Sequence, residues 1–383
     1  MLEFINQELE SLKKTGLYRK PVSIERINGS RITISKKEYL LFCSNNYLGL
    51  ANHPKVMQRA IEATKEFGFG AGASRLISGN TVLHEELEKR IARFKGLAAA
   101  LVFPTGYMAN LGAITALVDE SDTVIIDRLN HASIIDACRL SKAKLQVYPH
   151  KDMDALEKIL ARSAHYQKRL IITDSVFSMD GDIAPLPQIV ELARKYNAIT
   201  MIDEAHATGI IGKTGKGAEE YFGIEGQIDI VMGTLSKALG SLGGFIAGSY
   251  ELIDYLKNKA RSFIYTTALP PAACAAALAA LDIIEAEPEL RNKLAENIRA
   301  FGERETPIIP LIIGDAKKTM EISQKLFEQG LFISGVRPPT VPEGESRLRI
   351  TVTASHSKEE IECLVSSLQG LILKSEKHSL PSF

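Results

Sequence analysis

The sequence predicts an α/β protein: a large domain on a mostly parallel sheet with helices on both faces, and a smaller α+β domain at the C-terminal end. Short β-rich runs recur through the middle of the chain, and most of them are separated by segments with helical spacing. Strands that alternate with helices favour a parallel sheet. The β-rich runs occupy residues 98–103, 123–127, 144–148, 169–174, 199–204, 229–234 and 243–248.

The first fifty residues are expected to form a helix followed by β structure. The helix covers about residues 3–14, and the runs IERING and SRITIS then flank Asn28-Gly29, a pair that favours a hairpin turn. YLLFCSNNYLGL is expected to be a strand that runs into a loop, with a helix following over about residues 53–67. The expected divisions are an N-terminal segment over 1–50, a large domain over 51–285 and a small domain over 286–383.

The pattern changes after about residue 286, which is why a second domain is expected there. A charged helix leads to the strand TPIIPLIIG, the helix KKTMEISQKLFEQG, a strand, a proline-rich loop, the strand SRLRITVT and a last helix. Only GERE separates the charged helix from TPIIPLIIG.

Composition excludes several classes of protein. Lys and Arg number 46, as do Asp and Glu, so the formal net charge is zero. A nucleic-acid-binding protein normally has a basic excess or a basic stripe, so we expect no nucleic-acid partner. The four cysteines form no CxxC pair, which argues against a zinc module and a disulfide framework and favours reduced core thiols. The N-terminus lacks a signal-peptide pattern, and the uncharged stretch 262–281 contains prolines and much alanine. We therefore expect a cytoplasmic protein with no membrane partner.

Two glycine-rich runs resemble known ligand-binding motifs but do not match them, and the histidines form no known motif. GFGAGAS (68–74) follows a helical pattern, whereas a dinucleotide-binding loop must follow a strand. GIIGKTGKG (209–217) lacks the first glycine of a phosphate-binding P-loop, so we expect an exposed turn. The histidines form no metal-ligand spacing, and no serine lies in a G-x-S-x-G elbow. We expect no catalytic metal and no hydrolase triad.

Two strand ends carry the residues that matter most for chemistry. ITMIDEAHATG delivers Asp203 and His206, and DIVMGTLSKALGSLGG delivers Thr234 and Lys237. In open α/β sheets, ligands bind at the carboxyl ends of the strands. One crossover separates Asp203 from Lys237, so the two side chains can face the same crevice.

A lysine and an aspartate in one crevice fit an aldehyde cofactor with a basic ring nitrogen, pyridoxal 5'-phosphate (PLP). The amine of Lys237 forms an imine with the aldehyde, and Asp203 keeps the ring nitrogen protonated, so that the ring is an electron sink. Singly, an aspartate at a strand end is usually a helix cap, and a lysine in a glycine-rich turn is usually solvated. Their conjunction is much rarer than either part, and it favours the PLP interpretation.

The segment TLSKALGSLGG resembles the PLP attachment signature of the fold-type I, class II aminotransferase group, and within it the chain resembles the α-oxoamine synthases. The similarity covers nearly the whole chain. One departure is the short GERE link, where family members usually carry a longer helix and a short strand, so the small domain is expected to lack an edge element at 301–306. The matching stretches are SNNYLGL (44–50), GAGASRLISGN (70–80), FPTGYMAN (103–110), DRLNHASIIDAC (127–138), DSVFSMDGDIAPL (174–186), IDEAHATGIIG (202–212) and IYTTALPP (264–271).

The resemblance implies a fold-type I, aminotransferase-like fold and a role for each matched residue. Lys237 binds the cofactor covalently and Asp203 faces the ring nitrogen, while His131 stacks on the ring. The remaining cofactor residues are implied to contact the ring hydroxyl (Ser178, His206), the phosphate (Gly106, Tyr107, Thr234) and the phosphate of a neighbouring subunit (Thr266 or Thr267). The last contact implies a homodimer.

The resemblance also implies the reaction: members join an amino acid to an acyl thioester and release carbon dioxide. Segments 336–356 and 72–80 favour L-alanine and a pimeloyl thioester, carried by coenzyme A or by a carrier protein. Arg349 would bind the substrate carboxylate bidentately, with Arg19, Asn45 and Thr351 lining the substrate site. Surface ion pairs are the alternative for Arg349 and its neighbour Arg347. A member that joins glycine to acetyl-CoA, and a non-catalytic protein on the same fold, remain open as alternatives.

Overall fold

The structure is a computed structural model that describes residues 2–372, in two compact units. The large unit comprises Leu48–Ser178 and Asp182–Arg291, and the small unit comprises the chain up to Tyr47, Met179–Gly181 and the chain from Asn292 onward. The sequence divided the chain differently, with a separate N-terminal segment and a boundary at 286. We describe each unit by itself.

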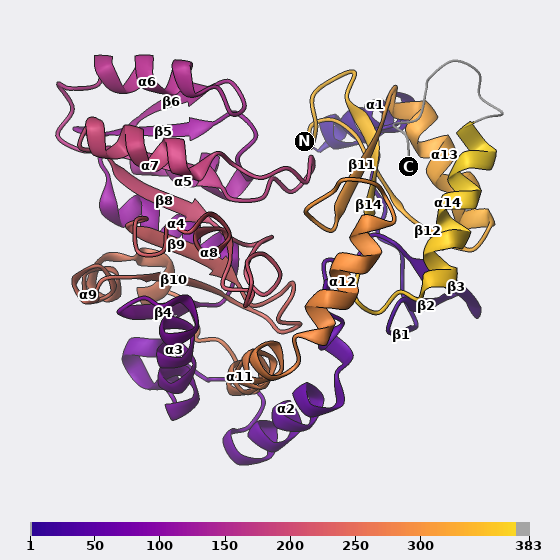
Figure 1. The fold of residues 1–383 in the computed structure, drawn as a ribbon, viewed down its shortest axis with the longest axis horizontal. Coiled ribbons are helices and arrows are strands. Elements are labelled where there is room, and N and C mark those ends of the chain that lie inside the picture. The colour runs from indigo at the N-terminus through magenta and orange to yellow at the C-terminus, as the bar shows by residue number, and fades with distance from the viewer. Residues whose placement is uncertain (1, 373–383) are drawn as a thin grey trace. The chain divides into compact units, whose positions relative to one another are not determined.

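The large unit is built on a seven-stranded sheet in the order β4-β10-β9-β8-β7-β5-β6 (Figure 1). The strands β5 to β9 pair in parallel, and β10 is antiparallel to both of its neighbours. The sheet is therefore mostly parallel, as the sequence predicted. Its strands are β4 (Ala99–Phe103), β5 (Thr123–Asp127), β6 (Lys144–Tyr148), β7 (Arg169–Asp174), β8 (Ile199–Asp203), β9 (Ile230–Thr234) and β10 (Gly244–Gly248).

Helices bury both faces of this sheet. Val124 and Ile126 of β5 join one apolar cluster, with α4 (Gly106–Leu117), α5 (Ala132–Ser141), α9 (Tyr250–Lys259) and α10 (Arg261–Ile264). Ile125 joins the other cluster, with α6 (Met153–Arg162), α7 (Leu186–Lys195) and α8 (Ala218–Phe222). A strand buried on both faces must be apolar at every position, which explains the continuous apolar runs in the sequence.

Three more helices pack beside the sheet in the large unit: α2 (Pro54–Phe67), α3 (Val82–Lys95) and α11 (Pro271–Ala286). Helix α11 contacts both α2 and α3, and its many buried alanines let the neighbouring backbones approach closely. The short turns Leu50–Asn52 and Arg75–Gly79 flank α2 and the glycine-rich run that follows it. Among the described residues, every helix is too short or too polar to cross a lipid bilayer.

The small unit contains two small sheets with helices. One sheet has the order β1-β2-β3-β12 and the other has the order β11-β14-β13. Their strands are β1 (Arg26–Asn28), β2 (Arg31–Ile34), β3 (Lys37–Leu41), β11 (Ile308–Gly314), β12 (Leu331–Phe332), β13 (Ser334–Val336) and β14 (Ser346–Thr351). The helices are α1 (Glu3–Lys14), α12 (Glu289–Arg299), α13 (Ala316–Glu328) and α14 (Lys358–Ile372).

The pairing of β3 with β12 explains why the N-terminal residues belong to the small unit. The two strands are parallel, with Leu40 opposite Leu331 and Leu41 opposite Phe332. The backbone N–H of Phe42 also donates to the carbonyl of Phe332 at 2.9 Å. A strand formed by residues near 40 therefore completes a sheet formed by residues near 330, which local sequence patterns do not reveal.

The cysteines only partly match the expectation of reduced core thiols. All four are free, and Cys138 and Cys274 are buried. Cys43 is half-buried, however, and Cys363 on α14 is exposed, so the expectation of a core position was wrong for Cys363. Its place on the solvent-facing side of a helix accounts for the difference.

Candidate active site

Side chains at the carboxyl ends of the strands line a cavity of about 250 Å³ in the large unit. This is the edge of a parallel sheet at which ligands bind. The cavity brings together these residues that the sequence singled out: Gly106, Tyr107, His131, Ser178, Asp203, His206, Thr234 and Lys237. It is also lined by Thr105, Asn110, Ser133, Asp174, Ala205, Met232 and Ser236.

Asp203 is the last residue of β8, and its carboxylate is held in a fixed orientation. One oxygen, Oδ1, accepts the backbone N–H of Ala205 at 2.9 Å, and the other, Oδ2, accepts the side-chain amide of Asn110 at 2.8 Å. The residue is 3% exposed. Two donors thus hold a buried negative charge that can face a cationic ring nitrogen.

The turn after Asp203 is anchored by a buried ion pair. Glu204 pairs with Lys95 of α3, and its Oε1 accepts the backbone N–H of Ala218 at 2.6 Å. Both charged side chains are almost completely buried. Loss of one partner would leave an uncompensated buried charge, so this pair fixes the backbone that carries Asp203 and His206.

Lys237 lies beyond β9, with its Nζ 2.8 Å from Nε2 of His206. The turn that carries it is tightly constrained. Gly240 has a φ of +63°, and a Cβ there would lie 2.2 Å from the backbone nitrogen of Ala51. Only glycine fits such an approach, so the chain direction after Lys237 is set by backbone packing.

One end of the cavity is built to receive an anion. Helix α4 begins there. The backbone N–H groups of Gly106 and Tyr107 lie in its first turn, so they have no acceptor within the helix and can donate to a bound anion. The Thr105 hydroxyl caps the helix by accepting the N–H of Met108 at 3.1 Å. The hydroxyls of Thr234 and Ser236 lie 2.7 Å apart in the same cavity. The Thr234 hydroxyl donates to the carbonyl of Gly243 at 2.9 Å. In the hydrogen bond between the two hydroxyls, Ser236 is therefore the donor and Thr234 the acceptor.

His131 and Asp174 form the next part of the wall. His131 caps α5, and its backbone N–H donates to Oδ2 of Asp174 at 2.8 Å. Burial, with the charge of Lys237, lowers the pKa of His131 although Asp203 raises it, so the ring is neutral at neutral pH. Burial, together with the negative charge of Asp203, raises the pKa of Asp174 well above its usual value. Asp174 and Asp203 thus lie in the same cavity, close enough for the charge of one to act on the other.

Thr266 and Thr267 do not line this cavity. They follow α10 in the large unit, where the N–H of Ala268 donates to the carbonyl of Ala73 at 2.9 Å. Their expected contact with a neighbouring subunit's phosphate stays a prediction.

The expected substrate residues Arg19, Asn45, Arg349 and Thr351 all belong to the small unit. Arg349 is 7% exposed, and its Nη1 donates to Oδ1 of Asn45 at 3.2 Å and to the Thr351 hydroxyl at 3.0 Å. Arg19 is exposed and donates to the carbonyl of Pro338 at 3.1 Å. The structure thus brings three of the four residues into one cluster.

Arg347 is buried, contrary to the alternative of a surface ion pair. It is 1% exposed and pairs with Asp180 at 2.6 Å and with Glu345 at 3.0 Å. Both arginines of β14 are buried, since Arg349 is 7% exposed, so the surface alternative was wrong for both. Strand β14 is the central strand of its sheet, between β11 and β13, rather than an exposed edge.

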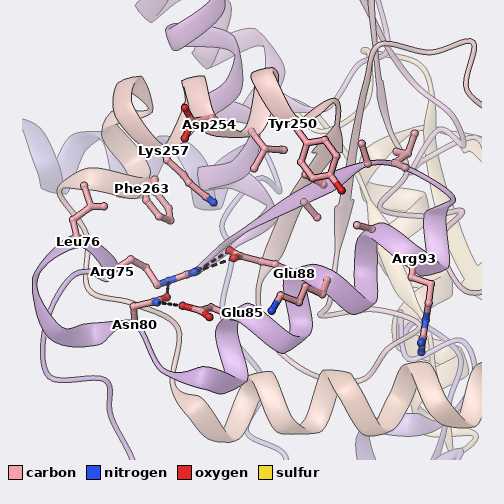
Figure 2. Close-up of a pocket in the computed structure, with 17 residues that line it drawn as sticks. Arg75, Leu76, Asn80, Glu85, Glu88, Arg93, Tyr250, Asp254, Lys257 and Phe263 are labelled. Carbon is pink, nitrogen blue, oxygen red and sulfur yellow. Dashed lines mark hydrogen bonds and ion pairs between the residues drawn. The ribbon is translucent and has the colours of Figure 1, made fainter.

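A larger hollow of about 870 Å³ lies elsewhere in the large unit. Figure 2 shows Arg75 between Asn80 and Glu88, with Leu76 and Phe263 nearby. Arg75 donates to Glu88 at 2.9 Å and 3.1 Å. Arg75 is already paired with Glu88 in this hollow, whereas the smaller cavity collects strand-end side chains. We therefore assign the chemistry to the smaller cavity.

Comparison with known proteins agrees with this geometry. The family model described as aminotransferase class I and II matches residues 37–368. An 8-amino-7-oxononanoate synthase of Thermoanaerobacter pseudethanolicus is 49% identical over 380 residues, covering 96% of each chain. One of Citrifermentans bemidjiense is 52% identical over 369 residues, covering 93% of this chain and 95% of the relative.

Solved structures show the same fold. A serine palmitoyltransferase of S. paucimobilis with bound PLP and myriocin superposes with a TM-score of 0.91 at 32% identity, covering 96% of both chains. An 8-amino-7-oxononanoate synthase of Francisella tularensis superposes with a TM-score of 0.76 at 28% identity, covering 88% of this chain and 98% of the other. The fold is that of fold-type I PLP enzymes, as the sequence predicted. The chain belongs to the class I and II aminotransferase family, and within it to the α-oxoamine synthases.

Proposed function

We propose that this protein condenses L-alanine with a pimeloyl thioester in biotin biosynthesis, and releases 8-amino-7-oxononanoate, carbon dioxide and the free thiol. The single observation that carries the proposal is one cavity lined by Lys237, Asp203 and His131, in a chain about half identical to 8-amino-7-oxononanoate synthases over almost its full length. The acyl carrier is coenzyme A or a carrier protein.

The cavity fits PLP by the chemistry of its donor set. A lysine amine, a buried carboxylate with two donors and the start of a helix are the groups required by an aldehyde, a ring nitrogen and a phosphate, respectively. When bound, PLP supplies the aldehyde for lysine attachment and a protonated ring that accepts electrons from the substrate.

The chain's own residues then have distinct tasks. Asp203 keeps the ring nitrogen protonated. Lys237, with His206 at 2.8 Å from its Nζ, takes the α-proton of alanine at that nitrogen and later returns a proton to the product. The N–H groups of Gly106 and Tyr107 hold the phosphate, with hydroxyls from Thr234 and Ser236. His206 and Ser178 contact the ring hydroxyl.

We propose that Arg349 binds the substrate carboxylate. Its guanidinium is nine-tenths buried, and Nη1 donates to the amide oxygen of Asn45 and to the hydroxyl of Thr351. A planar guanidinium held in this way can bind a carboxylate bidentately. Asn45 and Thr351 orient it, and Arg19 also lines the substrate site.

We propose that the working unit is a homodimer. A run of exposed apolar side chains supports it: Phe69 is 79% exposed, Ile77 80% and Tyr265 71%. Tyr265 directly precedes Thr266 and Thr267, and the hydrogen bond from Ala268 to Ala73 joins the two segments. Exposed apolar patches of this kind mark protein interfaces.

A product assay tests the reaction. Purified protein is loaded with PLP and given L-alanine or glycine with pimeloyl-CoA, a pimeloyl carrier protein or acetyl-CoA, and the products are identified by mass spectrometry. We expect 8-amino-7-oxononanoate from alanine and a pimeloyl thioester. One methyl group discriminates by about 10- to 200-fold, so some glycine turnover is compatible. Preferred turnover of glycine with acetyl-CoA would support the alternative substrate pair, and no product at all would support a non-catalytic protein.

Lys237→Ala should abolish turnover, because the only amine proposed to bind PLP covalently is removed. The variant should also lose the visible absorbance of lysine-linked PLP. Lys213→Ala is the matched control, because Lys213 is exposed on the 209–217 turn. Full turnover in Lys237→Ala would contradict the mechanism.

A further inference from the structure

We propose that Asn110 and Ser133 are positioning residues that hold His131 as the neutral tautomer with its proton on Nε2, while the same Asn110 amide orients Asp203. The inference deepens the proposed function, on which it rests for the roles of His131 and Asp203. Neither Asn110 nor Ser133 was selected from the sequence.

The Asn110 amide can have only one orientation. It lies on α4, is completely buried, and its Nδ2 donates both to Oδ2 of Asp203 and to Oγ of Ser133, at 2.8 Å each. A carboxylate can only accept, so the NH₂ group must face Asp203. The opposite orientation would place the amide oxygen against a carboxylate oxygen.

This orientation is energetically unfavourable for the amide oxygen of Asn110. Oδ1 of Asn110 is buried without a hydrogen-bond partner. Such an orphaned acceptor destabilises the fold, and it persists only where other contacts fix the group. Both hydrogens of the NH₂ group, each with its own acceptor, supply those contacts.

Ser133 links the oriented amide of Asn110 to the ring of His131. The Ser133 hydroxyl oxygen accepts from Asn110 and lies 2.7 Å from Nδ1 of His131. The backbone N–H of Ser133 donates to Nδ1, at 3.3 Å, which requires a lone pair on Nδ1. The hydroxyl hydrogen of Ser133 can then point to the same lone pair, and the proton of the neutral ring is on Nε2.

The surroundings of His131 favour the neutral ring. The charged groups that face it are Lys237, which opposes an imidazolium, and Asp203 and Asp136, which favour one. Burial is the largest influence and lowers the pKa of His131. The result is a neutral ring in the cavity wall whose Nε2–H is a hydrogen-bond donor for a substrate oxygen.

One buried hydrogen-bond network therefore orients two side chains of the site, Asp203 and His131. The chain of contacts runs from Asp203 through Asn110 and Ser133 to His131, across β8, α4 and α5. It links the carboxylate for the ring nitrogen to the imidazole that stacks on the ring. Loss of Asn110 should disturb both side chains. Loss of the Ser133 hydroxyl should disturb His131 directly, whereas Asp203 keeps its hydrogen bond from Asn110.

An NMR experiment measures the tautomer of His131 directly. Protein with nitrogen-15-labelled histidine is examined by NMR without PLP, and the His131 signals are assigned by comparison with His131→Gln. We expect an unprotonated Nδ1 and a protonated Nε2 in the wild type. Ser133→Ala should show a mixture of tautomers, while Ser133→Thr, which keeps the hydroxyl, should restore the wild-type pattern. Protonation of Nδ1 in the wild type, or an unchanged tautomer in Ser133→Ala, would overturn the proposal.

Kinetics of the loaded enzyme supply the second readout. Asn110→Leu and Ser133→Ala should each lower kcat about tenfold or more, because each loses a buried hydrogen bond in the network. Thr115→Ala, on the same helix with its hydroxyl bonded to the carbonyl of Leu111, is the control for folding. If the protein lacks the proposed reaction, the NMR result in the cofactor-free protein still decides the tautomer. If Asn110→Leu does not fold, Ser133→Ala and Ser133→Thr carry the test.

Discussion

At the scale of single residues, the site contains two carboxyl groups whose surroundings differ. Asp203 is buried but has two hydrogen-bond donors, so its negative charge is compensated. Asp174, in the same cavity, accepts one backbone N–H, and burial raises its pKa well above the usual value. Two carboxyl groups in one cavity thus have different hydrogen-bonded surroundings, and only Asp203 has a donor on each of its oxygens.

Asp203→Asn should still bind PLP but should lose most of its turnover, by about 100-fold or more. An amide keeps the shape of the carboxylate, yet it cannot stabilise a positive charge on the ring nitrogen. Steady-state kinetics and a PLP-binding titration measure the two effects separately. Asp254→Asn, an exposed carboxylate on α9, is the control. Turnover near that of the wild type would refute the role of Asp203.

At the scale of elements, the sequence predicted the strands well and the side-chain network poorly. Each β-rich run corresponds to a strand of the large sheet within a residue at either end, because apolar runs reflect burial on both faces. Asn110 lies inside the motif FPTGYMAN, one helical turn after Gly106, but nothing in the motif shows what its amide contacts. That contact exists only when α4, α5 and β8 meet.

The end of β5 is joined to the segment that carries Ser178 by a charged cluster. The Nδ1 of His150 lies 3.0 Å from Asp127, the last residue of β5, and its Nε2 lies 2.9 Å from Asp182. Lys151 also pairs with Asp182 at 2.9 Å. Burial lowers the pKa of His150, but the hydrogen bonds to Asp127 and Asp182 outweigh it and raise the pKa to about 9.

This cluster predicts a loss of stability in alkaline solution. The folded-state pKa of His150 is raised from 6.5 to about 9, so the stabilisation is complete below pH 6.5 and is lost as the pH rises through about 9. Urea unfolding between pH 6 and pH 10 should show this loss in the wild type and a smaller one in His150→Asn. His165→Asn, at an exposed histidine, should behave as the wild type. Equal pH dependence in His150→Asn and the wild type would rule out the cluster as the cause.

At the scale of the whole molecule, segments that are far apart in the sequence pack together, and the sequence does not show which ones. Strand β3 pairs with β12, and the buried ring of Phe42 stacks on His356 with centroids 4.3 Å apart. Residues near the start and the end of the chain therefore share one core, so the first segment is part of the small unit. Local patterns predict a strand or a helix, but they do not predict a partner some 290 positions away.

Assembly is the last property of the whole molecule that the residues imply. If Thr266 and Thr267 serve the neighbour's phosphate, Lys237→Ala and the double variant Thr266→Ala/Thr267→Ala should each be inactive, and their mixture should regain activity. In a mixed dimer, the subunit with an intact Lys237 receives intact threonines from its partner. After random exchange, half of the dimers are mixed and each has one complete site, so activity should return to about a quarter of the wild-type value. Sedimentation confirms the dimer, and the Lys237→Ala variant mixed with itself is the control. If the threonines act within their own subunit, every site in the mixture lacks one required residue, and the mixture stays inactive.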